Sequence, residues 1–128
     1  MKMNVLIITC LVMAILGCNG LTQRDIVKEF IPGTYSAEWQ TELNATKDTL
    51  SLQVLTQDGS ETFLIIRRSR IVFINAAKNR PPEYRLVKWA GTYDSKTKTI
   101  FINNNGRVLS FEPQKEILWM GTIKYKKL

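Results

Sequence analysis

The chain of 128 residues contains no histidine. Histidine is the commonest general base in enzymes and the commonest metal ligand in proteins, so its absence excludes Ser-His-Asp and Cys-His catalysis. The sequence also has no Gly-rich phosphate-binding loop and no metal-ligand cluster. Its carboxylates occupy polar strand positions or turn starts, where capping of a turn is their ordinary role. We therefore expect no catalytic residue, no metal and no cofactor, and hence a protein that is not an enzyme.

Cysteine is scarce as well, and both copies lie near the N-terminus, at Cys10 and Cys18. Residues 1–4 form a short basic start, and residues 5–16 form an apolar run that is too short to span a bilayer comfortably. Cys18 directly follows a glycine at the end of this run, which resembles the lipobox of bacterial lipoprotein signals. Leu16 is bulkier than the usual residue at its position. In such signals the thiol of the cysteine receives a diacylglycerol, and cleavage falls just before it.

We predict that residues 1–17 are a lipoprotein signal peptide and that a lipid on Cys18 attaches the protein to a membrane. The alternative is an ordinary secretory signal that is cut near Gly20. With Cys10 removed and Cys18 lipidated, no intramolecular disulfide is available, so the fold must be held by burial alone. Loss of Lys2 with the signal lowers the formal net charge from +7 to +6.

The remaining chain is long enough for one domain with one modest core. Residues 18–33 read as a tether, in which residues 24–30 form a short helix with an apolar stripe. Residues 34–128 read as an antiparallel β domain, because apolar and polar residues alternate from Thr34 to Glu42 and again from Tyr84 to Tyr93. Further predicted strands and turns follow the same pattern: a turn over 43–46, a strand over 50–54, a hairpin turn at Asp58-Gly59, a bent strand or two strands over 61–76 interrupted at 67–70, a loop over 78–83, a turn over 104–106, and a final strand over 117–125.

Seven or eight strands at roughly ten-residue spacing predict an antiparallel up-and-down meander. We expect a small lipocalin-like barrel or a curled sheet, preceded by the short helix, with a β-sandwich as the alternative. Trp39, Trp89 and Trp119 occupy apolar strand positions and are predicted to lie in the core. A small barrel of this kind either fills with side chains or holds one ligand.

A basic group in the middle of the chain is the candidate binding site. If the strands over 61–76 and 84–93 pair, several of its members share a face or rim that suits an anionic glycan or a lipid headgroup. Nucleic acid is disfavoured, because its binding usually adds exposed aromatic residues to such charge. The alternative is a set of charges that discourages aggregation of strand edges. The members are Arg67, Arg68, Arg70, Arg85 and Lys88.

Short motifs along nearly all of the mature chain resemble a known group of proteins. They include Pro32-Gly33-Thr34-Tyr35, Asp48-Thr49-Leu50, Pro81-Pro82-Glu83-Tyr84, Gly91-Thr92-Tyr93-Asp94 and the closing Lys124-Tyr125-Lys126-Lys127-Leu128. The sequence is similar to small lipoproteins of unknown function associated with conjugative transposons of Bacteroides-type bacteria. This resemblance implies an envelope setting and a link to conjugative transfer. It brings no catalytic or binding residues with it.

These observations lead to two hypotheses. The first is a non-enzymatic, lipid-anchored cell-envelope protein that acts through protein–protein or envelope-surface contacts, with other envelope proteins as partners. The second is a binding module for a small or anionic ligand at a basic barrel mouth. Asn19 rather than Asp follows Cys18, and residues 19–23 contain no acidic run. We therefore expect the periplasmic side of the outer membrane.

Overall fold

A computed structural model of the chain describes residues 24–55 and 61–128. The predicted signal peptide, Cys18 and the Asp58-Gly59 turn lie outside the described residues. Within the described ranges the elements follow one another along the chain, with short connections between most of them. They are α2 (Ile26–Phe30), β1 (Gly33–Gln40), β2 (Asn44–Val54), β3 (Thr62–Phe73), the 3-10 turn η1 (Asn75–Ala77), β4 (Glu83–Asp94), β5 (Thr99–Ile102), β6 (Val108–Glu112), η2 (Pro113–Lys115), β7 (Ile117–Met120) and β8 (Ile123–Lys127).

The eight strands of the described chain form one closed antiparallel barrel in sequence order. Each strand pairs with the next, and β8 returns to β1 through the pairs Tyr35↔Lys127 and Ser36↔Lys126. The predicted up-and-down meander with a preceding short helix is therefore confirmed, and the structure is a barrel rather than a sandwich. No helix among the described residues has the length and apolarity needed to cross a lipid bilayer.

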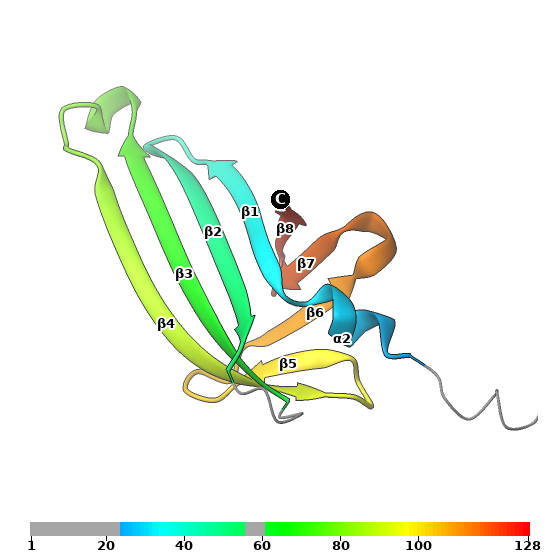
Figure 1. Cartoon of the computed structure of the whole chain (residues 1–128). Coiled ribbons are helices and arrows are strands. Elements are labelled where there is room, and N and C mark those ends of the chain that lie inside the picture. The colour runs from blue at the N-terminus through cyan, green and yellow to red at the C-terminus, as the bar shows by residue number, and fades with distance from the viewer. Residues whose placement is uncertain (1–23, 56–60) are drawn as a thin grey trace, which may run out of the picture.

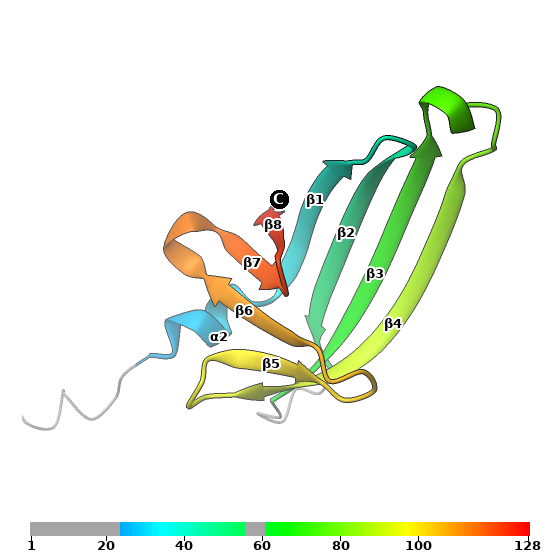
Figure 2. The same cartoon turned by 180° about the vertical axis from the view of Figure 1, so that it is seen from behind.

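The barrel is asymmetric because its strands differ in length. β2, β3 and β4 have 11, 12 and 12 residues, whereas β5 to β8 have four or five each. Figures 1 and 2 show β1–β4 side by side in a curved sheet that extends beyond the short strands, with η1 at its far end between β3 and β4. This extension has an outer face and an inner, concave face, and both carry charged side chains.

The core lies at the end of the barrel that α2 covers. Tyr35, Leu50, Ile65 and Tyr125 are fully buried there with the other inward-facing apolar residues. The hydroxyl of Tyr35 donates a hydrogen bond to the carbonyl oxygen of Ile31 over 2.9 Å, which attaches the end of the helix to the barrel. Because α2 is only five residues long, its stability comes from this packing and from its cap rather than from helix propensity.

Close packing at Gly91 joins β4 to its neighbours. A Cβ atom at this position would lie 2.5 Å from Cγ2 of Ile100 and 2.9 Å from Cδ1 of Ile65. These distances are shorter than two carbon atoms can approach without a shift of one of them. Glycine is therefore required at Gly91 for β5 to fold tightly against β3 and β4.

Three of the local predictions are wrong. The turn predicted over 43–46 lies mostly within β2, which begins at Asn44. The inward positions Thr46 and Asp48 of this strand are polar but buried, so hydrophobic alternation gave no signal there. Of the two alternatives over 61–76, the structure has the single strand, β3, but the expected break at 67–70 is absent, because the register with β2 and β4 runs without a bulge. The stretch 117–125 is two strands, because the chain turns at Gly121 with a φ of +60°.

The tryptophans lie nearer the surface than predicted. Trp39 and Trp89 are only partly buried and pack against the edge of the core. Trp119 alternates with the buried Leu118 and Met120 on β7 and so faces outward. Its indole N–H donates to Oε2 of Glu112 over 2.8 Å. The fully buried aromatic residues are instead mainly tyrosines, and the hydroxyl of each donates a hydrogen bond to a carbonyl or carboxylate oxygen. They are Tyr35, Tyr93 and Tyr125.

Candidate anion-binding sites on the long strands

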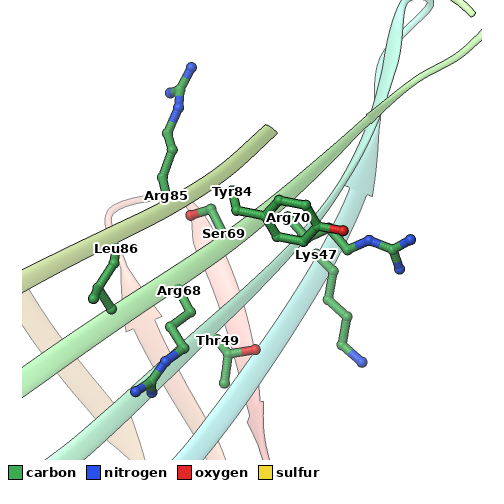
Figure 3. Close-up of a pocket in the computed structure, with 8 residues that line it drawn as sticks. All are labelled: Lys47, Thr49, Arg68, Ser69, Arg70, Tyr84, Arg85 and Leu86. Carbon is green, nitrogen blue, oxygen red and sulfur yellow. The ribbon is translucent and has the colours of Figure 1, made fainter. Parts of the chain in front are cut away.

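The five predicted basic residues divide between the two faces of the β3–β4 hairpin. Residues that are paired across antiparallel strands point to the same side of a sheet. The pairs Arg68↔Leu86 and Ile66↔Lys88 place Arg68 and Lys88 on the outer face. Arg70 lies two residues further along β3 and is therefore on the outer face as well. Arg67 and Arg85 lie on the inner face; Figure 3 shows Arg85 pointing away from Arg68 and Leu86. The structure thus brings only part of the predicted set together.

On the outer face the basic residues form rows that cross three strands. Lys47 of β2 pairs with Arg70 of β3, which pairs with Tyr84 of β4. The next row consists of Thr49, Arg68 and Leu86 in the same order, and the two rows line an open groove of about 300 Å³ (Figure 3). The full lining is Lys47, Thr49, Arg68, Ser69, Arg70, Tyr84, Arg85 and Leu86.

Large apolar surface lies exposed beside these charges. Tyr84 is 72% exposed and Leu86 is 58% exposed. Within residues 24–55 and 61–128, neither Arg68 nor Arg70 forms an ion pair, and no carboxylate is among the groove-lining residues. Glu38 of β1 is the register partner of Lys47 on its other side. We name Lys47, Arg68, Arg70, Tyr84 and Leu86 the outer basic face.

On the inner side, Asp48 forms a buried polar cluster. Asp48 is fully buried, and its carboxylate accepts from Nε of Arg67 over 2.9 Å and from Oγ of Ser69 over 2.6 Å. The hydroxyl of Tyr125 donates a third hydrogen bond, to Oδ2. Three donors thus satisfy a charge that would be costly to bury alone. Burial, together with the neighbouring Asp48, raises the pKa of Tyr125 above its ordinary value.

A second arginine reaches the same region from the loop before β6. The guanidinium carbon of Arg107 lies 5.5 Å from the ring centroid of Trp89, and that of Arg67 lies 5.9 Å from the same centroid. Nη1 of Arg107 also lies 3.7 Å from Sδ of Met120. Both distances to Trp89 are within the range of cation–π attraction. Trp89 therefore holds two guanidinium groups at the end of the barrel where the β5–β6 loop and the β7–β8 turn lie. We name this end the barrel mouth.

An open cavity of about 430 Å³ lies beside these two arginines. Its lining combines the two cations with apolar side chains and a hydroxyl. The lining residues are Arg67, Arg107, Val108, Met120, Gly121, Thr122 and Ile123. Arg107 was not among the predicted site residues, and neither were Lys47, Tyr84 and Leu86. The exposed apolar pair was detectable from the sequence, since it shares a period of two with Lys88 on β4.

The chemistry that these sites offer is anion binding. Guanidinium groups match carboxylate and phosphate oxygens with paired hydrogen bonds. In the described part of the chain, no three His, Cys, Asp or Glu side chains come together in a way that would hold a metal ion. The carboxylate of Asp48, which lies beside the mouth, already accepts hydrogen bonds from three donors of the protein. The outer basic face and the barrel mouth lie on opposite faces of the sheet and are two separate candidate sites.

Comparisons of the chain with protein-family models, with curated proteins and with solved structures find no match. The resemblance to lipoproteins of conjugative transposons therefore stays a prediction.

Proposed function

We propose that the protein is a lipid-anchored component of a bacterial cell envelope that works without catalysis, by laying its outer basic face on anionic lipid headgroups. The observation that carries this proposal is that Arg68 and Arg70, which form no ion pair within residues 24–55 and 61–128, lie beside exposed apolar side chains on one face. Arg68 and Arg70 project beside Tyr84 and Leu86, which are more than half exposed.

This combination suits the boundary between headgroups and acyl chains. A tyrosine ring places its apolar body in the interface and its hydroxyl in water, and arginine stems do the same with their charged ends. Each Lys or Arg near an anionic surface contributes about 1 kcal/mol of attraction at physiological ionic strength. Three such residues and two apolar side chains give weak, reversible association with a lipid surface. That association alone would orient a protein rather than anchor it.

The predicted lipid on Cys18 would supply the anchor. A single attachment leaves a protein free to swing about its tether, whereas a second contact fixes which face meets the membrane. The residues between Cys18 and the docked helix α2 provide the tether in this proposal. The anchor is tested by intact mass and membrane fractionation of the native protein beside Cys18→Ser. An acylated mass with membrane retention, both lost in the variant, supports the anchor, whereas an unacylated soluble protein overturns it.

The surface contact is tested separately in the chain that carries Cys18→Ser, so that no acyl chain contributes. Binding to vesicles is measured by co-sedimentation. Vesicles of phosphatidylcholine with about 30% phosphatidylglycerol, which gives a clearly anionic surface, are compared with vesicles of phosphatidylcholine alone. We expect binding to the anionic vesicles only, and we expect it to weaken as salt is raised.

The matched variants compare two pairs of cations. Arg68→Gln/Arg70→Gln removes two charges from the outer basic face. Lys96→Gln/Lys124→Gln removes two charges from exposed positions outside it, on the β4–β5 turn and on β8. We expect the arginine pair to lose about tenfold or more in affinity and the lysine pair to lose clearly less. Equal losses would show that only net charge matters and would overturn the proposed face.

A further inference from the structure

We propose that the mouth of the barrel is a binding site for a small amphipathic monoanion, whose carboxylate or phosphate group meets Arg67 and Arg107 while its apolar part lies against Met120 and Ile123. This site is on the inner side of the sheet. It is therefore distinct from the outer basic face, and it does not depend on a lipid anchor.

The first argument is the fixed orientation of Arg67. Its Nε donates to Asp48 over 2.9 Å, and its side chain is 19% exposed. The carboxylate of Asp48 is also held by Ser69 and Tyr125 and has no exposed surface. The Nε contact thus fixes the plane of the guanidinium, and in the described structure its terminal nitrogens have no carboxylate partner. A guanidinium that is held in this way loses little freedom when it binds an anion.

The second argument is the charge balance of the mouth. Arg67 and Arg107 carry two positive charges, and Asp48 carries one negative charge. Arg107 forms no ion pair within residues 24–55 and 61–128. Two guanidinium groups beside one indole repel each other unless an anion lies between or near them. One negative charge on a ligand neutralises the cluster.

The third argument is the cavity itself. Its volume of about 430 Å³ falls within the range of small-molecule sites, which are mostly apolar with a few placed polar groups. Met120 is nearly buried and Ile123 is half-buried at its wall, and Thr122 adds a hydroxyl. A charged group at one end and an apolar wall at the other select an amphipathic ligand. A purely ionic or a purely apolar molecule would use only half of the site.

The test measures binding of decanoate by isothermal titration calorimetry, below the concentration at which it forms micelles. Decanol, which has the same chain without the charge, is the ligand control. Decyl methyl phosphate, a diester that carries one negative charge as decanoate does, reports whether the site prefers a phosphate to a carboxylate. We expect decanoate or decyl methyl phosphate to bind with one site per chain and to bind at least about tenfold more tightly than decanol. Equal affinity of all three compounds would overturn the proposal.

The variants separate this site from the outer basic face. Arg107 is exposed and forms no ion pair in the described part of the chain, so Arg107→Gln is expected to fold, which thermal melting checks. We expect Arg107→Gln to weaken decanoate binding about tenfold and Arg107→Lys, which keeps the charge but loses the planar fork, to weaken it less. Arg68→Gln, on the other side of the same sheet, should leave decanoate affinity unchanged. Unchanged binding in Arg107→Gln, or equal loss in Arg68→Gln, would overturn the proposal whatever the vesicle experiment shows.

Discussion

Nε of Arg67 and Oδ2 of Asp48 form an ion pair of 2.9 Å across the β2–β3 hairpin, at a point where the carboxylate has no exposed surface. The two residues are nineteen positions apart in the chain. Asp48 lies directly opposite Ser69, and Arg67 lies opposite Leu50, so the pair is diagonal in the sheet. This ion pair separates the apolar core of the barrel from the open mouth.

Replacing Asp48 is expected to cost more stability than replacing any exposed carboxylate. Asp48→Asn leaves Arg67 with an uncompensated charge at a partly buried position, and we expect a loss of about 3 kcal/mol or more in the free energy of unfolding. Chemical denaturation measures this loss. Glu38→Gln, at an exposed position of β1, is the control and should stay within about 0.5 kcal/mol of the parent. Similar midpoints for the two variants would contradict the role given to Asp48.

Stability is expected to fall at alkaline pH because of three buried tyrosines. Burial raises the pKa of Tyr35, Tyr93 and Tyr125 above the ordinary value of about 10. Hydrogen bonds to carboxylates add to the rise at Tyr93 and Tyr125. Above pH 10 the unfolded chain therefore releases protons that the folded chain keeps. Stability is fully present below about pH 10 and declines above it, by up to about 1.4 kcal/mol per pH unit for each tyrosine.

The alkaline decline is measured by denaturant unfolding between pH 8 and pH 11. Tyr125→Phe removes one of the three groups, so its stability should depend less steeply on pH in this range. The same variant removes the hydroxyl that donates to Asp48 and should lose about 1.5–3 kcal/mol at neutral pH. A parent protein whose stability is flat up to pH 11 would contradict the raised pKa values.

Gly91→Ala is expected to destabilise the barrel by overpacking. The added methyl group would meet Ile100 at 2.5 Å and Ile65 at 2.9 Å, and both side chains are fully buried. Because neither can move into open space, we expect a loss of about 1–3 kcal/mol. Thr92→Ala, at the next and exposed position of β4, is the comparison for the same strand. A neutral effect of Gly91→Ala would mean that β5 shifts to make room.

Asp25 is expected to control the docking of α2. Its carboxylate accepts from the backbone N–H of Lys28 over 3.1 Å, from the hydroxyl of Tyr93 over 2.9 Å and from Nζ of Lys98 over 3.2 Å. It thus caps the helix and ties it to β4 and the β4–β5 turn. Asp25→Ala should cost about 1–2 kcal/mol, and hydrogen exchange of the Ile31 amide should accelerate. Asp25→Asn, which retains a capping oxygen, should lose less, and equal losses would contradict the capping role.

The sequence predicted the fold wherever the inner face of a strand was apolar. Val87, Trp89 and Tyr93 alternate on β4 against Leu86 and Ala90, and the structure places them on the faces that this alternation indicates. The prediction failed over the first half of β2. There the inner positions Thr46 and Asp48 are polar although they are buried, and Asp48 belongs to the buried cluster with Arg67, Ser69 and Tyr125. Hydrophobic periodicity carries no information about a strand whose inner face is stabilised by hydrogen bonds.

The candidate sites were less predictable than the fold. Arg67 and Arg68 are neighbours in the sequence, and in a strand neighbours point to opposite faces. Which of the two faces inward depends on the register between β2 and β3, and that register is not readable from a single sequence. Arg107 follows the turn between β5 and β6, and its guanidinium reaches the ring of Trp89 on β4. Sites of this kind depend on contacts between distant segments, whereas a single-sequence pattern reports local ones.

The unequal strand lengths have a consequence for the order in which the chain folds. Every strand pair except one joins neighbours in the sequence, and the long hairpins β2–β3 and β3–β4 contain 11 and ten register pairs. Local pairings lose little loop entropy, so they form early. The pair β1–β8 has only two register pairs and joins segments about ninety residues apart, which makes it the slowest contact to form. We therefore expect a three-stranded nucleus of β2–β4, onto which the short strands assemble before β8 meets β1, so that substitutions in β8 accelerate unfolding while those in β3 slow folding.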